Sequence, residues 1–435
     1  MIRTRLSVMM FLQFFIWGAW LPLIFGYLPA LKFDDNQQFF ILGAFNFAAI
    51  VAMFFSTQFA DRNFSAERFL AFSHLIGGIS ILGCAATTSF WPFFIFMLVH
   101  CLFYVPTISI TNSIAFANVK DPQRDFGLVR LWGTIGWIAA SWPFVLILAD
   151  WAKVPALGSV SVIQWLGAVL GNGKTGDALV SATRYTFIAA GTASLVLAAF
   201  SLLLPHTPPK PAAKGDSAFA WLDAMKLLGV PFMLVLFLVT FIDATVHQCY
   251  FVWTGRYLIS IGIPANWVMP AMSVGQFAEI GTMAVLGAFL KMLGWRWTMV
   301  IGILGHAVRF AVFAFFPDPV PAVAVNVLHG VCYAFFFATV YIFVDEFFPK
   351  DARSSAQGLF NLLILGIGPL VGNFVGPRLL SFFTVKIANG VEVVNFSRLF
   401  LIPSFAALVA AVMLALLFHP PEKAAPADSA TLPPH

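Results

Sequence analysis

Residues 205–217, Pro205 to Ser217, read PHTPPKPAAKGDS, and this stretch decides how the chain is divided. Its prolines lack a backbone N–H and interrupt helices, and its polar, Pro-rich composition is typical of a linker. Long apolar runs lie on both sides of it. The sequence therefore predicts two halves and a polar connection between them. The expected units are an N-terminal half at 1–205, a cytoplasmic linker at 206–230, a C-terminal half at 231–418 and a disordered cytoplasmic tail at 419–435.

The composition excludes a soluble globular protein. Of the 435 residues, 60% are hydrophobic and only 10% are charged, and the mean hydropathy is +0.89. In soluble domains about a quarter of the residues are charged. A transmembrane β-barrel would show alternating segments of about ten residues, and we find none. The composition indicates an all-α polytopic membrane protein, whose net charge of +5 reflects basic loops beside the spans rather than nucleic-acid binding.

Twelve apolar runs are long enough to cross a bilayer, which takes about 20 helical residues. Six precede the linker and six follow it. Lysine and arginine are more numerous in the segments that share a side with the N-terminus, so we expect both termini in the cytoplasm. The first run is too long for a cleavable signal peptide. The predicted spans are 5–30, 39–60, 69–88, 92–117, 129–151, 184–205, 231–258, 267–293, 298–316, 320–347, 355–383 and 397–418.

Two charged residues within the expected membrane depth, Glu279 and Arg130, point to a site. Glu279 lies in the eighth span, with Gln276 one turn earlier on the same helical face. Arg130 opens the fifth span, and Thr134 and Trp137 follow it at i+4 and i+7, which places all three on one stripe. An ionisable residue inside a membrane is costly and marks a functional site by default. Together these residues predict a polar site for a small molecule inside the bundle.

Six spans on each side of a cytoplasmic linker is the arrangement of the major facilitator fold, whose two halves rock about a site near the midplane. The loop after the second span agrees with this. Asp61 and Arg62 follow Ala60, and Arg68 lies beyond, which resembles the G-x-x-A-D-R-x-x-x-x-R/K loop motif of that superfamily, with Thr57 in the first position. The motif predicts a gating contact in which Asp61 accepts hydrogen bonds from a helix N-terminus. An ordinary topogenic charge cluster is the alternative.

Four stretches narrow the assignment within the superfamily: FLQFFIWGAW at 11–20, VRLWGTIGW at 129–137, SVGQFAE at 273–279 and RSSAQG at 353–358. The combination of R-x-W-G-T-x-G in the fifth span with Q-x-x-E in the eighth is the most specific feature. By these stretches the chain resembles the nucleoside:proton symporter family, and the resemblance runs from the first span to the eleventh.

The resemblance implies uptake of nucleosides by proton symport and alternating access, in the inner membrane of a bacterium. Aromatic rings suit stacking on a base, amides suit its edges, and a carboxylate suits the hydroxyls of a ribose. The same residue types also suit a sugar, so the nucleoside assignment comes from the family. The ligand-binding positions that carry over are Arg130, Thr134, Trp137, Gln248, Gln276, Glu279, His329 and Tyr333.

The residue that would couple transport to protons is harder to assign than the ligand-binding residues. The family's tenth helix usually reads Y-D-F-F, whereas this chain has Ala334 after Tyr333, so the usual acid is absent. The proton-coupling candidates are Glu279 and the i, i+4 pair of Asp243 and His247 in the seventh span. That pair either relays protons or forms a local hydrogen bond, and the local bond is the favoured interpretation. An uncoupled nucleoside uniporter stays open.

Other functions are weaker predictions. A sugar or drug carrier of the same superfamily would keep the fold and change the ligand, and a membrane receptor would bind without transport. We expect no enzyme, because no metal cluster or nucleophile–base motif is evident, and no ATP-driven pump, because no G-x-x-x-x-G-K-[ST] loop occurs. The expected partners are a nucleoside, protons and lipid, without cofactor, metal or nucleic acid, and the expected state is a monomer.

Overall fold

A computed structural model describes residues 2–55, 64–119, 122–209, 226–347, 359–386 and 392–420. Asp61 and Arg62 of the predicted gating motif, the stretch 353–358, most of the linker and most of the tail lie outside these residues. Arg68 is described, and its side chain is exposed in the first turn of helix α4.

The residues before the linker form the N-terminal bundle. Its long helices occupy the first six predicted spans, and α1 packs against α6 and α9 while α4 packs against α5 and α9. Each helix satisfies its own backbone hydrogen bonds, as a segment in lipid must. They are α1 (Ile2–Ala30), α2 (Asp35–Phe55), α4 (Ala66–Ala85), α5 (Phe90–Asn118), α6 (Pro122–Ser141) and α9 (Gly176–Ser201).

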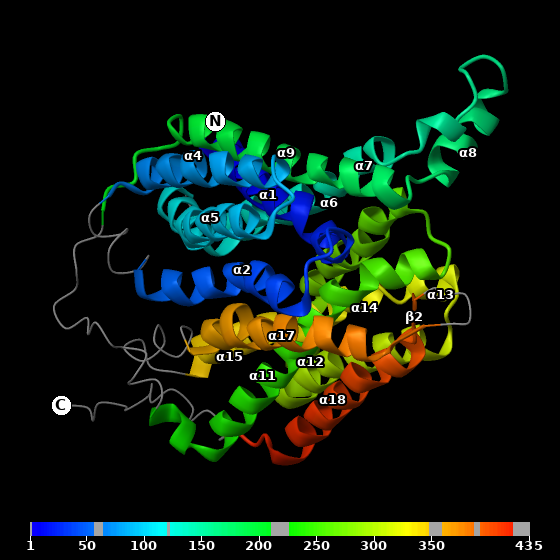
Figure 1. Ribbon diagram of the computed structural model, residues 1–435. Coiled ribbons are helices and arrows are strands. Elements are labelled where there is room, and N and C mark those ends of the chain that lie inside the picture. The colour runs from blue at the N-terminus through cyan, green and yellow to red at the C-terminus, as the bar shows by residue number, and fades with distance from the viewer. Residues whose placement is uncertain are drawn as a thin grey trace, which may run out of the picture.

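Between α6 and α9 the chain forms an arm that projects from the bundle (Figure 1). It contains α7 (Pro143–Ile147), a 3-10 turn (Trp151–Lys153) and α8 (Val162–Gly171). Ser161 and Gln164 form a capping box that fixes where α8 begins. The sequence indicates an apolar segment here, and the structure makes it a separate short helix.

The residues after the linker form the C-terminal bundle. It begins with a 3-10 turn (Lys226–Gly229), and another such turn (Ala265–Trp267) precedes its second long helix. That helix, α12, bends at Gly294, whose φ of 70° is in the left-handed region that glycine tolerates best. Two segments are π-helical, Tyr333–Ala338 and Leu362–Ile367. The α-helices are α11 (Pro231–Ser260), α12 (Val268–Phe315), α13 (Pro319–Ala324), α14 (Val327–Cys332), α15 (Thr339–Phe347), α17 (Gly368–Phe382) and α18 (Phe396–Leu417).

Within the described residues, nine helical segments are long and apolar enough to cross a membrane. One of them, Ala265–Phe315, has 51 residues and, with its bend at Gly294, covers both the eighth and the ninth predicted spans. Helices α2 and α6 occupy the second and fifth predicted spans. The predicted all-α polytopic fold is confirmed, and the strands of the described chain form one short hairpin, β1 (Thr384–Lys386) with β2 (Glu392–Val394).

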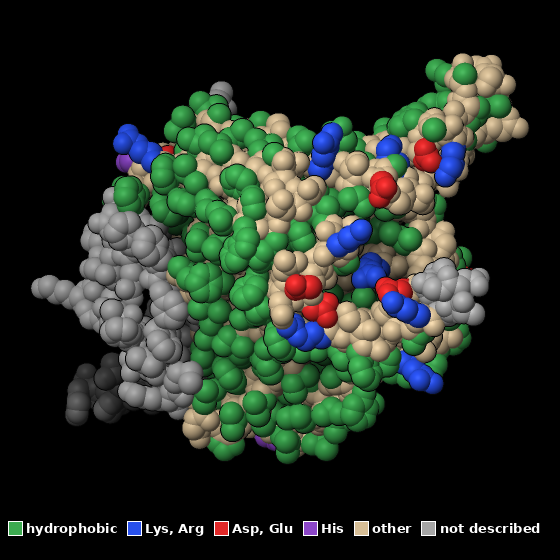
Figure 2. Space-filling view, in the orientation of Figure 1, with side chains coloured by type: hydrophobic (Ala, Val, Ile, Leu, Met, Phe, Trp, Pro, Cys, Tyr) green, Lys and Arg blue, Asp and Glu red, His purple; other side chains and the backbone are tan. Residues whose placement is uncertain are grey.

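The two bundles meet along α2 and α17, which lie side by side across the middle of the molecule (Figure 1). Helix α1 also contacts α11, and α6 contacts α12. On the visible face, hydrophobic side chains form a broad band, and most charged side chains gather at the end where α8 and β2 lie (Figure 2). This distribution is what a bundle with a lipid-facing middle and a water-facing end requires.

Candidate binding site between the two bundles

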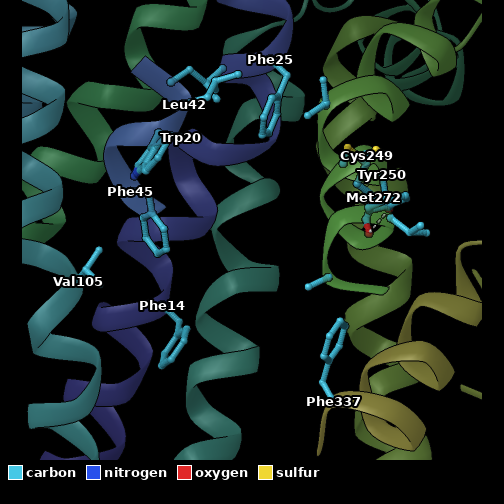
Figure 3. Packing of buried hydrophobic residues seen from close by; sticks show 14 of the residues in the cluster. Phe14, Trp20, Phe25, Leu42, Phe45, Val105, Cys249, Tyr250, Met272 and Phe337 are labelled. Carbon is cyan, nitrogen blue, oxygen red and sulfur yellow. Dashed lines mark hydrogen bonds between the residues drawn. The ribbon is translucent and has the colours of Figure 1, made fainter. Parts of the chain in front are cut away.

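A cavity of about 600 Å³ lies between the bundles. Its walls come from α1, α2, α5 and α6 on one side and from α11, α12, α14, α17 and both π-helical segments on the other. Phe14 and Phe337 lie on opposite sides of the space between the bundles (Figure 3). The volume is in the range of about 300–1,000 Å³ that small-molecule sites have.

The structure brings every predicted ligand-binding residue to this one cavity. His247, a predicted coupling residue, lines it as well, whereas Asp243 is fully buried behind the wall. The residues come from four separate regions of the sequence, so the convergence is a property of the fold. The lining includes Arg130, Thr134, Trp137, Gln248, Gln276, Glu279, His329 and Tyr333.

On the N-terminal wall, a close approach of α1 and α6 sets the direction of the polar stripe. A Cβ atom at Gly136 would lie 2.1 Å from the Phe11 carbonyl oxygen, so only glycine allows this contact. The stripe then faces the cavity, with the Arg130 guanidinium 4.0 Å from the centre of the Phe14 ring. The Trp137 ring meets Trp17 edge to face at 5.3 Å, which leaves an aromatic surface along this wall.

On the C-terminal wall, α14 crosses α12 at Glu279. A Cβ at Gly330 would lie 2.3 Å from the Glu279 backbone nitrogen, so this crossing also needs glycine. The amide of Gln276 is best assigned with its nitrogen donating to the carbonyls of Met272 (3.1 Å) and Ser273 (3.3 Å). That assignment leaves the Gln276 amide oxygen, a hydrogen-bond acceptor, available to a ligand.

Arg130 and Glu279 give the two walls opposite charges. Neither side chain forms an ion pair or a side-chain hydrogen bond with a residue that the structure describes, and they interact electrostatically across the cavity. Two charged groups at membrane depth without direct partners are costly unless something between them satisfies them. The arrangement can therefore bind a polar molecule that accepts from one wall and donates to the other.

The π-helical segment Tyr333–Ala338 changes which side chains of the tenth span reach the cavity. Tyr333 and Phe337 line it, whereas Ala334 is fully buried in a separate apolar cluster with Leu286 and Phe335. π-Helical turns occur frequently at functional sites. At the position where the family usually has an acid, this chain thus has apolar packing.

A chain of amide hydrogen bonds crosses between the bundles beside the cavity, and sequence reasoning missed most of it. Gln248 donates to Asn373 (2.8 Å), and Asn373 donates to Asn46 (2.8 Å). Asn46 in turn donates to the Leu365 carbonyl (2.9 Å). Asn46 and Asn373 both line the cavity. The available signal was an asparagine inside each of two apolar runs, where a polar side chain usually bonds across helices.

At the end of the molecule near α8 and β2, hydrogen bonds join the two bundles directly. Ser381 donates to Asp35 (3.1 Å), and Arg378 donates to Asn36. At the same end, Trp267, in the turn before α12, donates to the carbonyl of Leu170 in α8 at 2.6 Å. These contacts hold the two bundles together at this end.

The family comparison agrees with this geometry. The profile of the family described as nucleoside H+ symporter matches residues 1–170 and 155–423. The putative nucleoside transporter YegT of Escherichia coli is 32% identical over 427 residues, covering 96% of this chain and 93% of that protein. Xanthosine permease of Escherichia coli is 28% identical over 445 residues, covering 97% of this chain and 98% of that protein.

Solved structures give the same result. A crystal structure of the nucleoside transporter NupG superposes with a TM-score of 0.78 at 25% identity and covers 96% of this chain and 99% of that one. A POT family transporter, at 9% identity and a TM-score of 0.70, shares the fold. The chain therefore belongs to the nucleoside H+ symporter family, whose members are multi-pass membrane transporters of the major facilitator fold and not enzymes.

Proposed function

We propose that this protein imports nucleosides together with protons, and that the cavity between the bundles is the nucleoside site. The observation that carries the proposal is the convergence of the eight predicted residues on one cavity of about 600 Å³. Family membership supports both the ligand class and the use of protons.

In the proposed complex, each part of a nucleoside meets a matching group. Trp137 and Tyr333 stand on opposite walls and stack on the base. Gln248 and Gln276 bond the edges of the base. Glu279 accepts hydrogen bonds from ribose hydroxyls. Such bonds to a charged group are among the stronger ones in proteins.

Three further lining residues complete the proposed site. Arg130 donates to carbonyl or hydroxyl oxygens of the nucleoside, and Thr134 lies one helical turn from it on the same wall. His329 lines the opposite wall, where its ring stacks with that of His247 at 4.9 Å. The two imidazoles are the point at which the nucleoside site meets the buried interior of the C-terminal bundle.

Alternating access follows from the placement of the two charges. Arg130 belongs to the N-terminal bundle (residues 1–205) and Glu279 to the C-terminal bundle (231–418), so a nucleoside that bonds both holds the bundles together. The inter-bundle hydrogen bonds near α8 close the end that we assign to the outside. Opening of the site toward that end then requires these bonds to break.

The membrane placement is also a proposal. Basic residues favour a cytoplasmic location for both termini and for the connection at 206–230. There His206 and the Thr207 N–H bond Glu67 at 2.8 and 2.9 Å and hold the start of that connection against α4. We assign the protein to a bacterial inner membrane as a monomer, with the loop motif of Asp61, Arg62 and Arg68 gating the cytoplasmic side.

Transport in proteoliposomes tests this function. Labelled uridine and adenosine are supplied with and without an inward proton gradient, using wild type, Gln276→Ala and Phe277→Ala. Phe277 is the matched control because it is the next residue on α12 but is 52% exposed on the outer face of the helix. We expect gradient-driven accumulation by wild type and Phe277→Ala and a much weaker one by Gln276→Ala. Equilibration without accumulation would mean a uniporter, and no uptake of either nucleoside would reject the nucleoside assignment.

A further inference from the structure

Behind the cavity, the C-terminal bundle encloses a group of polar side chains that the nucleoside site does not use. We call Asp243, His247, His306, Arg309 and His329 the C-terminal polar core. Three of them, Asp243, His306 and Arg309, have no exposed surface, whereas His247 and His329 line the cavity. The core therefore runs from the cavity into the closed interior of the bundle.

Arg309 fixes the hydrogen-bonding state of two of the histidines. Its two terminal nitrogens lie 2.9 Å from Nδ1 of His329 and 2.9 Å from Nδ1 of His306. A guanidinium can only donate, so both Nδ1 atoms must accept and cannot carry protons. Each of these imidazoles is thus a neutral ring with its proton on Nε2. Arg309 also lies 4.1 Å from the centre of the Tyr250 ring, which stabilises its charge.

The carboxylate of Asp243 is free to take up a proton. Neither of its carboxylate oxygens has a hydrogen-bond partner among the described residues. Its Oδ2 is 3.7 Å from Nε2 of His306, a distance longer than a hydrogen bond. A buried carboxylate without partners is much more stable as the neutral acid. A shift of either side chain toward the other would make the bond and favour the charged form.

We propose that Asp243 is the residue that carries the transported proton, and that Arg309 acts on it through His306 while His247 and His329 connect it to the cavity. This inference rests on the proposed nucleoside–proton symport and names its proton-binding site. It also gives Asp243 a different partner from the one that the i, i+4 spacing suggests. The expected local bond to His247 is not formed within the described structure, and the nearest polar contact is with His306 on α12.

The charge state of Asp243 can control the relative positions of α11 and α12. With Asp243 ionised, the core holds one negative and one positive group, and with Asp243 protonated it holds a single positive charge at Arg309. Because buried charge favours pairing, each state prefers a different separation of α11 and α12. His247 and His329 stack at 4.9 Å beside the nucleoside site, so a ligand that displaces either ring alters the same contacts.

Other titratable groups around the core are few. On the other helices that pack against α11, the basic side chains are elsewhere: Arg378 of α17 donates to the Phe374 carbonyl, Arg398 lies in the first turn of α18, and Arg3 and Arg5 lie at the start of α1. Glu279 belongs to α12 but faces the cavity. The groups that face the core are Asp243, His247, Tyr250, His306, Arg309, His329 and Cys332, from α11, α12 and α14.

The packing of Ala334 explains why another acid is needed. At that position the buried side chain packs with Leu286 and Phe335. A proton carrier placed elsewhere must be buried, must have a counter-charge and must connect to the cavity. Asp243 meets all three conditions, whereas Glu279 stands in the cavity wall, where it is available to the nucleoside itself.

The test separates movement of the nucleoside from its coupling to protons. Wild type, Asp243→Asn and Asp177→Asn are reconstituted, the last as a control that makes the same change at an exposed acid at the start of α9. Uridine counterflow is measured at equal pH on both sides of the membrane. Accumulation of uridine is measured under a proton gradient. Acidification of the vesicle lumen is measured after uridine is added. We expect Asp243→Asn to keep counterflow and to lose both accumulation and acidification, whereas Asp177→Asn keeps all three.

Accumulation and acidification by Asp243→Asn at the wild-type level would overturn the inference and leave the nucleoside carrier intact. Absence of uridine and adenosine counterflow in wild type would instead remove the proposed function, and this inference with it. If Asp243→Asn loses counterflow as well, the infrared spectra of Glu279→Gln and of Glu279→Gln/Asp243→Asn decide. A protonated-carboxyl band that shifts in D₂O and is present only in Glu279→Gln supports Asp243, and identical spectra reject it.

Discussion

The two bundles each bury histidines, but they use them differently. In the N-terminal bundle, His74 bonds Gln13 through Nε2 (2.8 Å) and Ser194 through Nδ1 (3.0 Å), and the Gln13 amide donates to Thr107 (2.9 Å). Tyr104 donates to the Gln13 carbonyl, so four helices are joined by one bonded network. In the C-terminal bundle, by contrast, Asp243 keeps both oxygens without a hydrogen-bond partner among the described residues.

The difference shows what distinguishes a structural polar core from one that can change state. A network in which each partner is satisfied has no free position for another proton and loses energy if it rearranges. A core with an unbonded carboxylate, a fixed cation and the His306 imidazole between them can take up a proton or form the missing bond. We therefore assign rigidity to the His74 network of the N-terminal bundle and proton handling to the C-terminal polar core.

Replacing Arg309 is the change with the largest expected effect. Arg309→Leu leaves two imidazole Nδ1 atoms without a donor and Asp243 without its counter-charge. Loss of one member of a buried charged group costs on the order of 3 kcal/mol, so the temperature of unfolding in detergent should fall and accumulation should stop. The double variant Asp243→Asn/Arg309→Leu removes both charges and should recover part of the stability. Equal unfolding temperatures for the single and double variants would show that the two residues are not electrostatic partners.

Replacing Glu279 should affect the nucleoside more than the proton. Glu279→Gln keeps the size of the side chain and removes the charge that accepts ribose hydroxyls. Hydrogen bonds to charged groups contribute about 1.5–3 kcal/mol, so the dissociation constant for uridine should rise roughly ten- to hundredfold, and accumulation should fall as binding falls. Equilibrium binding and counterflow should fall together, unlike in Asp243→Asn. Undiminished accumulation would exclude Glu279 from both the binding and the coupling roles.

The sequence predicts the fold and part of the cavity wall from local signals, whereas Gln248, His329 and Tyr333 come from the family resemblance. Arg130 and Glu279 are recognisable as charges inside apolar runs, and Thr134 and Gln276 follow from helical spacing. The same logic fails for Asp243, because its nearest polar neighbour is His306, 63 positions away and on another helix, and not the i+4 residue.

Features set by tertiary contact were not accessible from the sequence. The bond between Asn46 and Asn373 joins residues 327 positions apart, and neither side chain carries a charge that would single it out. The π-helical turn that directs Tyr333 and Phe337 into the cavity depends on packing of the whole bundle. The side-chain partners of Arg309 are likewise two imidazoles, one of them on α14.

A change in the N-terminal network should affect stability but not coupling. His74→Leu removes the partner of Gln13 and Ser194 and leaves buried polar atoms unsatisfied, which costs about 1–3 kcal/mol. The unfolding temperature should therefore fall, while the ratio of gradient-driven accumulation to counterflow stays that of wild type. The ratio is the informative quantity because it does not depend on how much folded protein enters the vesicles. A lower ratio would show that the N-terminal core also handles protons, and the distinction between the bundles would fail.

The smallest expected effect is at His247. His247→Phe keeps an aromatic ring for the stack on His329 and removes the nitrogens, of which Nδ1 has no partner in the described structure. If His247 passes protons between the cavity and Asp243, uridine-driven acidification should slow while the final accumulation stays unchanged, because a relay alters the rate of proton entry and not the driving force. The comparison is the pH dependence of the initial rate in wild type and variant, measured at saturating uridine. Identical profiles would exclude an essential relay through His247.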